Sequence, residues 1–195
     1  MPTLFWSLLG FFLGAIPFSL LIGKAALRTD IRTVGDGNPG ATNVLRSGSK
    51  AWAAMAMLLD MLKGALPVAL AHVIYGVAGW PLVPIALAPV LGHVFSPFLH
   101  GRGGKGVATT GGIWIGLTYG MATLVGAAGM SLGYALQDLP FWAVAFGFAC
   151  IGGYLALSRA DAVLWLILAL NAALVLWRYR DDLRRRPRLR WRKKA

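Results

Sequence analysis

The sequence predicts an all-α polytopic membrane protein, and three observations support this fold class. Hydrophobic residues make up 57% of the 195 residues, and the mean hydropathy is +0.65. Only 13% of the residues are charged, about half the fraction found in an ordinary soluble domain. Apolar runs of about 20 residues, long enough to cross a bilayer as helices, recur along the chain. The composition therefore excludes a disordered chain, a nucleic-acid-binding module and a typical water-soluble enzyme.

Six apolar segments are candidate spans, and one of them is too long for a single helix. They cover residues 4–23, 51–75, 80–99, 106–136, 141–157 and 162–177. As one helix, the segment 106–136 would measure about 45 Å against a hydrocarbon core of about 30 Å. Gly116, Gly120 and Gly126 offer places to break it. We therefore expect two helices there, near residues 107–117 and 119–136.

The distribution of charge predicts how the chain is oriented. The formal net charge is +12, and the basic residues gather in the loop 24–50, at Arg102 and Lys105, and in the tail. Short loops rich in Lys and Arg stay in the cytoplasm. The first apolar segment has no basic residues before it and is followed by Lys24 and Arg28, which favours a retained span with the N-terminus outside. An outer N-terminus and a cytoplasmic C-terminus require an odd number of spans, so we expect seven; the alternative is five, with one late segment re-entrant.

This topology implies one membrane domain, residues 1–178, with cytoplasmic loops at 24–50 and 101–106. Residues 179–195 form a basic cytoplasmic tail, which is suited to anionic membrane lipids. Nucleic acid is not an expected partner, because no nucleic-acid-binding fold accompanies the charge. No cofactor or metal is expected either, because the chain has one cysteine, three histidines, seven aspartates and no glutamate.

Two glycine-rich loops are the candidate functional sites. The first reads VGDGNPGATNVLR over residues 34–46, and Thr42 or Asn43 is predicted to cap a short helix there. Arg46 supplies a guanidinium suited to phosphate. A plain glycine-rich turn, with Arg46 only setting the topology, is the alternative. The first-loop candidates are Gly35, Asp36, Gly37, Asn38, Gly40, Thr42, Asn43 and Arg46.

The second loop contains GRGGKG over residues 101–106, followed by an apolar stretch typical of a helix. Bare backbone amides, the Lys105 charge and a helix start together resemble an anion cradle. The candidates here are Arg102, Gly103, Gly104, Lys105 and Gly106. Two such loops on one membrane face suggest two phosphate-bearing substrates held side by side.

Three ionisable residues lie inside predicted spans. His93 is a candidate proton acceptor, although a structural histidine between helices is an equal alternative. Asp60 and Lys63 are spaced to pair on one helix face, and we expect that pair to be structural. The residues offer no nucleophile–base–carboxylate triad. The chemistry that remains is positioning and charge stabilisation for an already activated donor, such as an acyl phosphate.

The motifs closely resemble the bacterial acyl-phosphate:glycerol-3-phosphate acyltransferase family, PlsY, over nearly the whole chain. The matching stretches are residues 35–46, especially NPGATNVLR, then Gly92-His93, residues 103–109, and LDMLKG at 59–64. The resemblance implies a seven-span, multi-pass enzyme of the bacterial inner membrane. It would transfer a fatty acyl group from acyl phosphate to the 1-hydroxyl of glycerol 3-phosphate, making lysophosphatidate for phospholipid synthesis.

By this resemblance, the first loop surrounds glycerol 3-phosphate and the transfer centre, and Lys105 holds the acyl phosphate. A soluble enzyme that forms acyl phosphate is a further candidate partner. Asp36 stands where the family has serine, Tyr179 where histidine is common, and Asp182, also a candidate substrate contact, where asparagine is expected.

These departures keep two other hypotheses open: a paralogue with another acceptor, or a catalytically silent partner. Asp60, Lys63 and His93 within the spans leave a small-anion transporter as a third. The sequence also leaves two candidates for the proton acceptor, His93 and a substrate phosphate.

Overall fold

The computed structural model describes residues 2–183, and every regular element in this part of the chain is helical. Most of the predicted basic tail, residues 184–195, lies outside the described residues. The elements are α1 (Pro2–Ala15), α2 (Phe18–Ala26), η1 (Ile31–Thr33), α3 (Ala41–Arg46), α4 (Lys50–Ala69), η2 (Leu70–Ile74), α5 (Leu82–Val94), η3 (Pro97–Leu99), α6 (Val107–Thr118), α7 (Met121–Leu136), α8 (Pro140–Leu157), α9 (Ala162–Trp177) and α10 (Arg180–Leu183).

The predicted break inside the long apolar segment is confirmed. Helix α6 ends at Thr118 and α7 begins at Met121, with Tyr119 and Gly120 between them in left-handed backbone conformations. Glycine adopts such a conformation without steric cost, which is why the chain turns there. Within the described residues, four helical segments are long and apolar enough to cross a membrane, and α6, α7 and α9 are shorter apolar helices.

The first predicted span differs from the prediction of one continuous helix. Pro17 separates α1 from α2, because proline donates no backbone hydrogen bond and clashes with the preceding helical turn. Two side chains from other segments bind the carbonyls freed at this break. Lys63 Nζ donates to the Ile16 carbonyl at 2.9 Å, and Ser96 Oγ donates to the Ala15 carbonyl at 2.6 Å.

Small residues allow the main helix pairs to pack closely, as is common in membranes. A side chain at Gly14 would overlap the Pro89 backbone, and one at Gly92 would overlap the Phe11 backbone, so α1 and α5 are in near contact. The same holds for Gly112 of α6 against α4. The central core lies among α5, α6, α8 and α9. Many large apolar side chains point outward, as expected for a surface facing lipid.

The expected Asp60–Lys63 pair is confirmed. Lys63 Nζ lies 2.6 Å from Asp60 Oδ1, and both side chains are buried. Ser19 Oγ donates to Asp60 Oδ2 at 2.8 Å, so the pair also joins α2 to α4. An unpaired charge in this position would be costly, and the pairing removes that cost.

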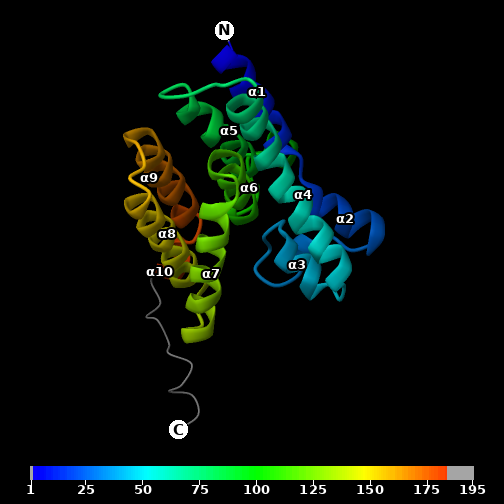
Figure 1. Ribbon diagram of the computed structural model, residues 1–195. Coiled ribbons are helices and arrows are strands. Elements are labelled where there is room, and N and C mark those ends of the chain that lie inside the picture. The colour runs from blue at the N-terminus through cyan, green and yellow to red at the C-terminus, as the bar shows by residue number, and fades with distance from the viewer. Residues whose placement is uncertain (1, 184–195) are drawn as a thin grey trace.

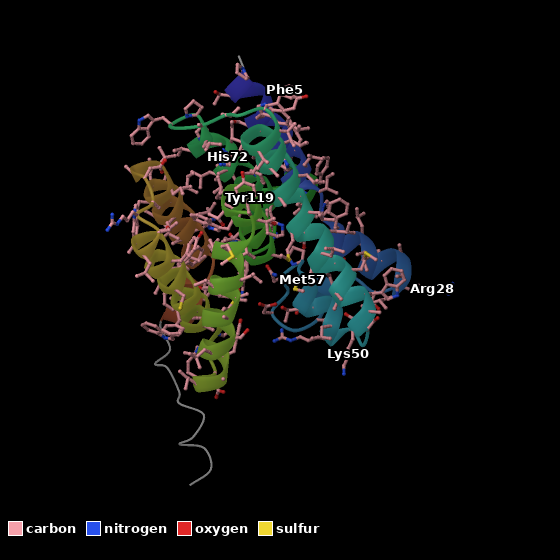
Figure 2. All side chains as sticks on the ribbon, in the orientation of Figure 1. Phe5, Arg28, Lys50, Met57, His72 and Tyr119 are labelled. Carbon is pink, nitrogen blue, oxygen red and sulfur yellow. The ribbon has the colours of Figure 1, made fainter. Side chains whose placement is uncertain are left out.

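The predicted polar segments gather at one end of the helix bundle. The N-terminus and Phe5 lie at one end, and α3, α10 and the start of α4 at Lys50 lie toward the other (Figures 1 and 2). The contacts described below place both glycine loops together at the end that holds α3 and α10.

Candidate functional site

The first glycine loop leads from η1 into the short helix α3. Just before the loop, the Asp30 side chain caps η1 by accepting a hydrogen bond from the Arg32 amide. Gly35 and Gly37 adopt left-handed conformations that fold the loop back toward α3. The prediction that Thr42 or Asn43 caps this helix is wrong, because the cap residue is Gly40 and no side chain supplies the cap bond. Asn43 is therefore free to bind other groups of the loop.

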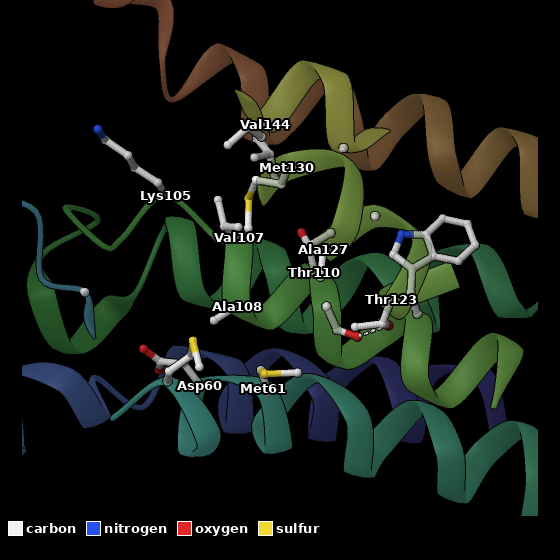
Figure 3. Close-up of a pocket in the computed structure, with 18 of the residues that line it drawn as sticks. Asp60, Met61, Lys105, Val107, Ala108, Thr110, Thr123, Ala127, Met130 and Val144 are labelled. Atoms are coloured by element: carbon white, nitrogen blue, oxygen red, sulfur yellow. Dashed lines mark hydrogen bonds between the residues drawn. The ribbon is translucent and has the colours of Figure 1, made fainter. Parts of the chain in front are cut away.

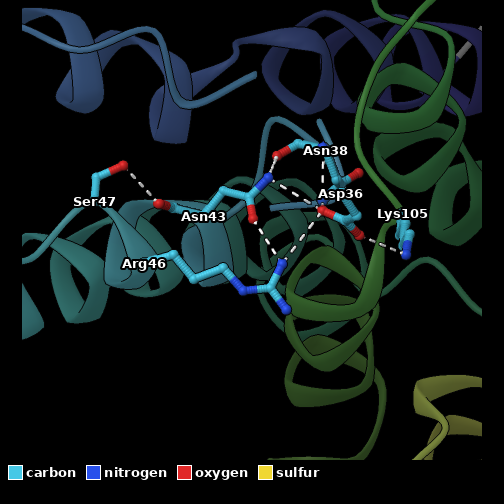
Figure 4. A network of polar contacts seen from close by, with 6 residues as sticks. All are labelled: Asp36, Asn38, Asn43, Arg46, Ser47 and Lys105. Atoms are coloured by element: carbon cyan, nitrogen blue, oxygen red, sulfur yellow. Dashed lines mark hydrogen bonds and ion pairs between the residues drawn. The ribbon is translucent and has the colours of Figure 1, made fainter. Parts of the chain in front are cut away.

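Asp36 is the centre of a polar network in this loop (Figure 4). Asn43 Nδ2 donates to Asp36 Oδ1 at 3.1 Å and to the Asn38 carbonyl at 2.9 Å. The Asn38 amide donates to Asp36 Oδ1 at 3.2 Å. Arg46 donates to Asn43 Oδ1 at 3.1 Å and lies 3.9 Å from Asp36 Oδ1. The buried Asn43 amide thus links the carboxylate to the guanidinium.

The second glycine loop is built differently from the anion cradle that we predicted. The amides of Gly103 and Gly104 donate to the carbonyls of Val94 and His93, at 3.0 and 3.1 Å. For these two residues, the prediction of bare amides is wrong. The glycines are needed because a side chain at Gly103 would overlap the His93 carbonyl and one at Gly104 would overlap its ring. The loop is a tight backbone connection between the end of α5 and the start of α6.

The start of α6 still offers backbone donors. Gly106 precedes the helix in a left-handed conformation, and Val107 and Ala108 begin the first turn. Amides of a first helical turn have no acceptor inside the helix and carry partial positive charge. Both residues line the cavity described below, and only Gly106 separates them from Lys105.

The two loops meet through an ion pair. Lys105 Nζ lies 2.8 Å from Asp36 Oδ2 and 4.2 Å from the centre of the Tyr179 ring. Partial burial raises the pKa of Asp36, but the hydrogen bond and charge of Lys105, with bonds from Asn38 and Asn43, outweigh it. The net pKa of Asp36 therefore lies below its ordinary value of 3.8. The two predicted loops therefore lie side by side in the structure.

A cavity of about 520 Å³ extends from this polar end into the bundle. Its polar mouth is formed by both loops and their neighbours: Asn38, Gly40, Thr42, His93, Lys105 and Tyr179. Its inner part, the apolar chamber, lies among α4, α6, α7 and α8 and includes Met61, Trp114, Ala127, Met130, Phe148 and Ile151. Figure 3 shows Lys105 at one end, Asp60 and Met61 on the α4 wall, and Ala127 and Met130 opposite them.

Parts of the chamber wall are open to the surroundings of the protein. Leu124 of α7 is 67% exposed and Met57 of α4 is 50% exposed, although both line the cavity. The chamber therefore reaches the outer, apolar surface of the helix bundle. A long apolar chain could enter it sideways without passing through the polar mouth.

His93 lies in the inner wall of the mouth and is almost fully buried. Its Nδ1 is 3.9 Å from Asp60 Oδ1, too long for a hydrogen bond. The Gly104 backbone covers its Nε2, which leaves no room for a side chain there. The geometry therefore fits both roles considered for His93: a structural residue that supports the second loop, and a group that faces the cavity.

The remaining predicted residues surround the mouth without lining the cavity. They are Gly35, Asp36, Gly37, Asn43, Arg46, Arg102, Gly103, Gly104 and Asp182. Arg102 is exposed, and Asp182 is close enough to Tyr179 for its charge to affect that residue. Among residues 2–183, no group of three His, Cys, Asp or Glu side chains is placed to hold a metal ion.

Sequence reasoning missed Arg178 and Asn171, which support the site, and named Tyr179 only as a departure from the family motif. Tyr179 packs over Lys105, and Arg178 donates to the Gly103 carbonyl at 2.8 Å. Asn171 of α9 donates to Thr110, which lines the chamber, at 3.1 Å. Nothing in the spacing of these residues relates them to the loops, because the contacts join segments more than 60 residues apart.

Comparison with known proteins identifies the family of this chain. The glycerol-3-phosphate acyltransferase family matches residues 4–188. The glycerol-3-phosphate acyltransferase of Rubrobacter xylanophilus is 40% identical over 181 residues, covering 91% of this chain and 87% of the relative. That of Methylorubrum populi is 41% identical over 178 residues, covering 91% of this chain and 85% of the relative.

Two solved structures have the same fold. Both are of PlsY (YgiH), an integral membrane glycerol 3-phosphate acyltransferase. The glycerol 3-phosphate form has a TM-score of 0.87 and 29% identity and covers 95% of this chain and 92% of that chain. The lysophosphatidic acid form has a TM-score of 0.86 and 28% identity, with 95% and 91% covered. This chain belongs to the glycerol-3-phosphate acyltransferase family.

Proposed function

We propose that this protein transfers a fatty acyl group from acyl phosphate to the 1-hydroxyl of glycerol 3-phosphate, forming lysophosphatidate for phospholipid synthesis. Relatives sharing 40% identity are named for acyl transfer to glycerol 3-phosphate. The structural relatives include a glycerol 3-phosphate form and a lysophosphatidic acid form of one enzyme. These are the acceptor and the product of the proposed reaction.

One observation carries the proposal: a single cavity joins a cationic mouth to an apolar chamber. An acyl phosphate has the same two parts, a charged phosphoryl group and an apolar chain. With its phosphoryl group at Lys105, the donor would place its chain among α4, α6, α7 and α8. Cavities of this size are typical of small-molecule sites.

Each loop has a distinct task in the proposed reaction. Lys105 and the first amides of α6 hold the donor's phosphoryl group and stabilise it as it leaves. Arg46 offers a fork of donors to the phosphate of glycerol 3-phosphate. The acceptor hydroxyl then attacks the acyl carbon directly, and positioning supplies most of the rate.

The other predicted residues complete the proposed site. Neutral contacts come from Asn38, Thr42 and Asn43, and an outer cation comes from Arg102. Gly103 and Gly104 act by fixing Lys105 to the end of α5. The proposed substrate contacts also include Gly35, Gly37, Gly40, Gly106 and Asp182, and His93 and Asp36 lie beside the reacting groups.

We further propose seven spans in the bacterial inner membrane, with the N-terminus outside and the C-terminus in the cytoplasm. Four apolar segments have the length of a span, and α6, α7 and α9 supply three shorter ones. The loops 24–50 and 101–106 would face the cytoplasm, where Lys and Arg are retained. The tail 179–195 would bind anionic lipid beside the membrane domain 1–178. A soluble enzyme would then deliver acyl phosphate to the cytoplasmic face.

The test is a donor–acceptor assay on the purified protein in detergent or vesicles. Acyl phosphate and glycerol 3-phosphate should give lysophosphatidate, acyl-CoA should be a poor donor, and Lys105→Ala should form product far more slowly. Other polyol phosphates are tested in parallel, because the Asp36 carboxylate between two cations could favour another acceptor. Absence of any acylated product above the Lys105→Ala background would refute the proposal.

A further inference from the structure

We infer that the Asp36 carboxylate accepts the proton of the attacking hydroxyl, which makes Asp36 the general base of this enzyme. The inference rests on the proposed function, because it assigns a role within that reaction. It starts from one juxtaposition: Asp36 lies between Arg46 and Lys105, at the junction of the two loops that are to hold the two substrates.

The Asp36 carboxylate pairs with both cations of the site. Lys105 is 2.8 Å from one oxygen, and Arg46 is 3.9 Å from the other. The Asn43 amide and the Asn38 backbone also donate to it. In this arrangement the two cations stabilise the ionised carboxylate, which makes Asp36 a weak base.

Substrate binding changes this balance. Each phosphoryl group carries more negative charge than a carboxylate and competes for Lys105 and Arg46. When those cations turn to phosphate, Asp36 loses its strongest partners and gains anionic neighbours. Both changes raise the pKa of a carboxyl group. The substrates themselves would thus convert Asp36 from an ion-pair partner into a base.

The other candidate bases in the described part of the site are less available. Asp60 is buried, 2.6 Å from Lys63, and accepts a bond from Ser19. His93 is buried, with its Nε2 covered by the Gly104 backbone. The side chain of Asp36, in contrast, is 45% exposed at the mouth.

The step balances without any further reactant. The hydroxyl oxygen forms a bond to the acyl carbon while its proton passes to an Asp36 oxygen. The bond from the acyl carbon to the phosphate oxygen then breaks, and phosphate leaves with the electron pair. Asp36 afterwards returns its proton to phosphate or water. The charged and titratable groups that interact with Asp36 are Lys105 and Arg46 in the loops and Tyr179 at the C-terminal end. Tyr134 of α7 and Asp182 interact with Tyr179 in turn.

The experiment compares Asp36→Asn and Asp36→Glu with the unaltered protein, measuring kcat and KM for both substrates between pH 5 and about pH 8. Asparagine keeps the size and one acceptor oxygen for the bonds from Asn38 and Asn43, but it loses the bond from Lys105 and cannot accept the proton. A general base typically contributes about 10²- to 10⁴-fold, so kcat of Asp36→Asn should fall by at least about 100-fold. Its KM for glycerol 3-phosphate should stay the same or fall, because a competing anion has been removed. Asp36→Glu should keep part of the activity.

The pH dependence of kcat distinguishes a general base at position 36 from a residue with a structural role only. The unaltered protein should lose kcat as pH falls through the raised pKa of Asp36, and Asp36→Asn should lack this limb. The limb from the substrate phosphate, near pH 6, should remain in both. Asp30→Asn is the matched control: the Asp30 carboxylate pairs with Arg32 in the same segment, whereas Asp36 pairs with Lys105 and Arg46, so kcat should not change.

An Asp36→Asn variant with undiminished kcat would overturn the inference, because the carboxylate would then only neutralise cations. If that variant does not fold, Asp36→Glu decides: loss of its acid limb overturns the inference, and a shifted limb supports it. Failure of the unaltered protein to form lysophosphatidate is a separate result that refutes the proposed function itself.

Discussion

The two glycine loops look alike in sequence but are built on opposite principles. In the first loop, side chains form the network, and Asp36 and Arg46 remain about half exposed. In the second, backbone forms the network, and Gly103 and Gly104 are buried against the end of α5. Glycine creates space for side chains in one loop and allows close backbone contact in the other. The first loop is therefore suited to binding substrates, and the second to holding Lys105 rigidly.

Replacing Lys105 by alanine tests the second loop and should have the largest effect. The variant removes the cation that stabilises the leaving phosphate, so kcat should fall by about 10²- to 10³-fold, as for other preorganised charge-stabilising donors. Lys50→Ala is the matched control, because Lys50 is exposed at the same end of the bundle, outside the cavity. Equal rates for the two variants in the acyl phosphate assay would contradict the role given to Lys105.

Replacing Arg46 by glutamine tests the first loop. A hydrogen bond to a charged group is worth about 1.5–3 kcal/mol, so KM for glycerol 3-phosphate should rise by about 10- to 100-fold. KM for acyl phosphate should change little, because Arg46 lies on the side of Asp36 away from Lys105. The comparison of the loops would be wrong if the donor KM rose instead of the acceptor KM.

Replacing Gly103 by alanine tests whether the second loop is a rigid support. The added methyl group would overlap the His93 carbonyl, and such overpacking costs about 1–3 kcal/mol. Thermal unfolding in detergent should show a lowered melting temperature, together with reduced activity. Gly153→Ala in α8 is the control, because a Cβ there meets nothing within 4 Å. Unchanged stability of Gly103→Ala would show that the loop is flexible.

Replacing Ala127 by phenylalanine extends the test to the apolar chamber and should have the smallest effect. The phenyl ring would occupy space between α7 and α4 that the donor chain is proposed to fill. Each methylene of the donor chain that is no longer buried costs about 0.8 kcal/mol of binding free energy. Activity with long-chain acyl phosphate should fall by about tenfold, the loss expected from one or two such groups, while short-chain donors lose less. Ala128→Phe, one residue later and outside the cavity, should not change chain-length preference.

The sequence was sufficient for the fold class and for the convergence of the loops, because both follow from apolar length and charge distribution. The break at Gly120 and the Asp60–Lys63 pair follow from local rules of helix length and spacing. The break at Pro17 was missed because the surrounding run is apolar throughout, and hydropathy does not register a helix break.

The finer structure of the site depends on tertiary contacts that spacing does not encode. Nothing local indicates that the Gly103 amide bonds Val94 or that Tyr179 packs over Lys105. The capping prediction failed because Asn43 makes longer-range bonds to Asp36 and Asn38, which helix-cap rules do not consider. The apolar chamber was not predicted because a residue lining a cavity and one packed in a core have the same apolar character.

We propose that one cavity holds the charged head of the acyl donor at Lys105 and its chain among α4, α6, α7 and α8. The direct measurement is photolabelling with a non-reactive acyl phosphonate whose chain carries a diazirine, followed by mass spectrometry of the labelled peptides. We predict adducts on cavity residues such as Met61, Ala127 and Met130, which are lost with excess unlabelled phosphonate and in Lys105→Ala. Adducts confined to the outer faces of α1 or α9, or labelling that persists in Lys105→Ala, would contradict the account.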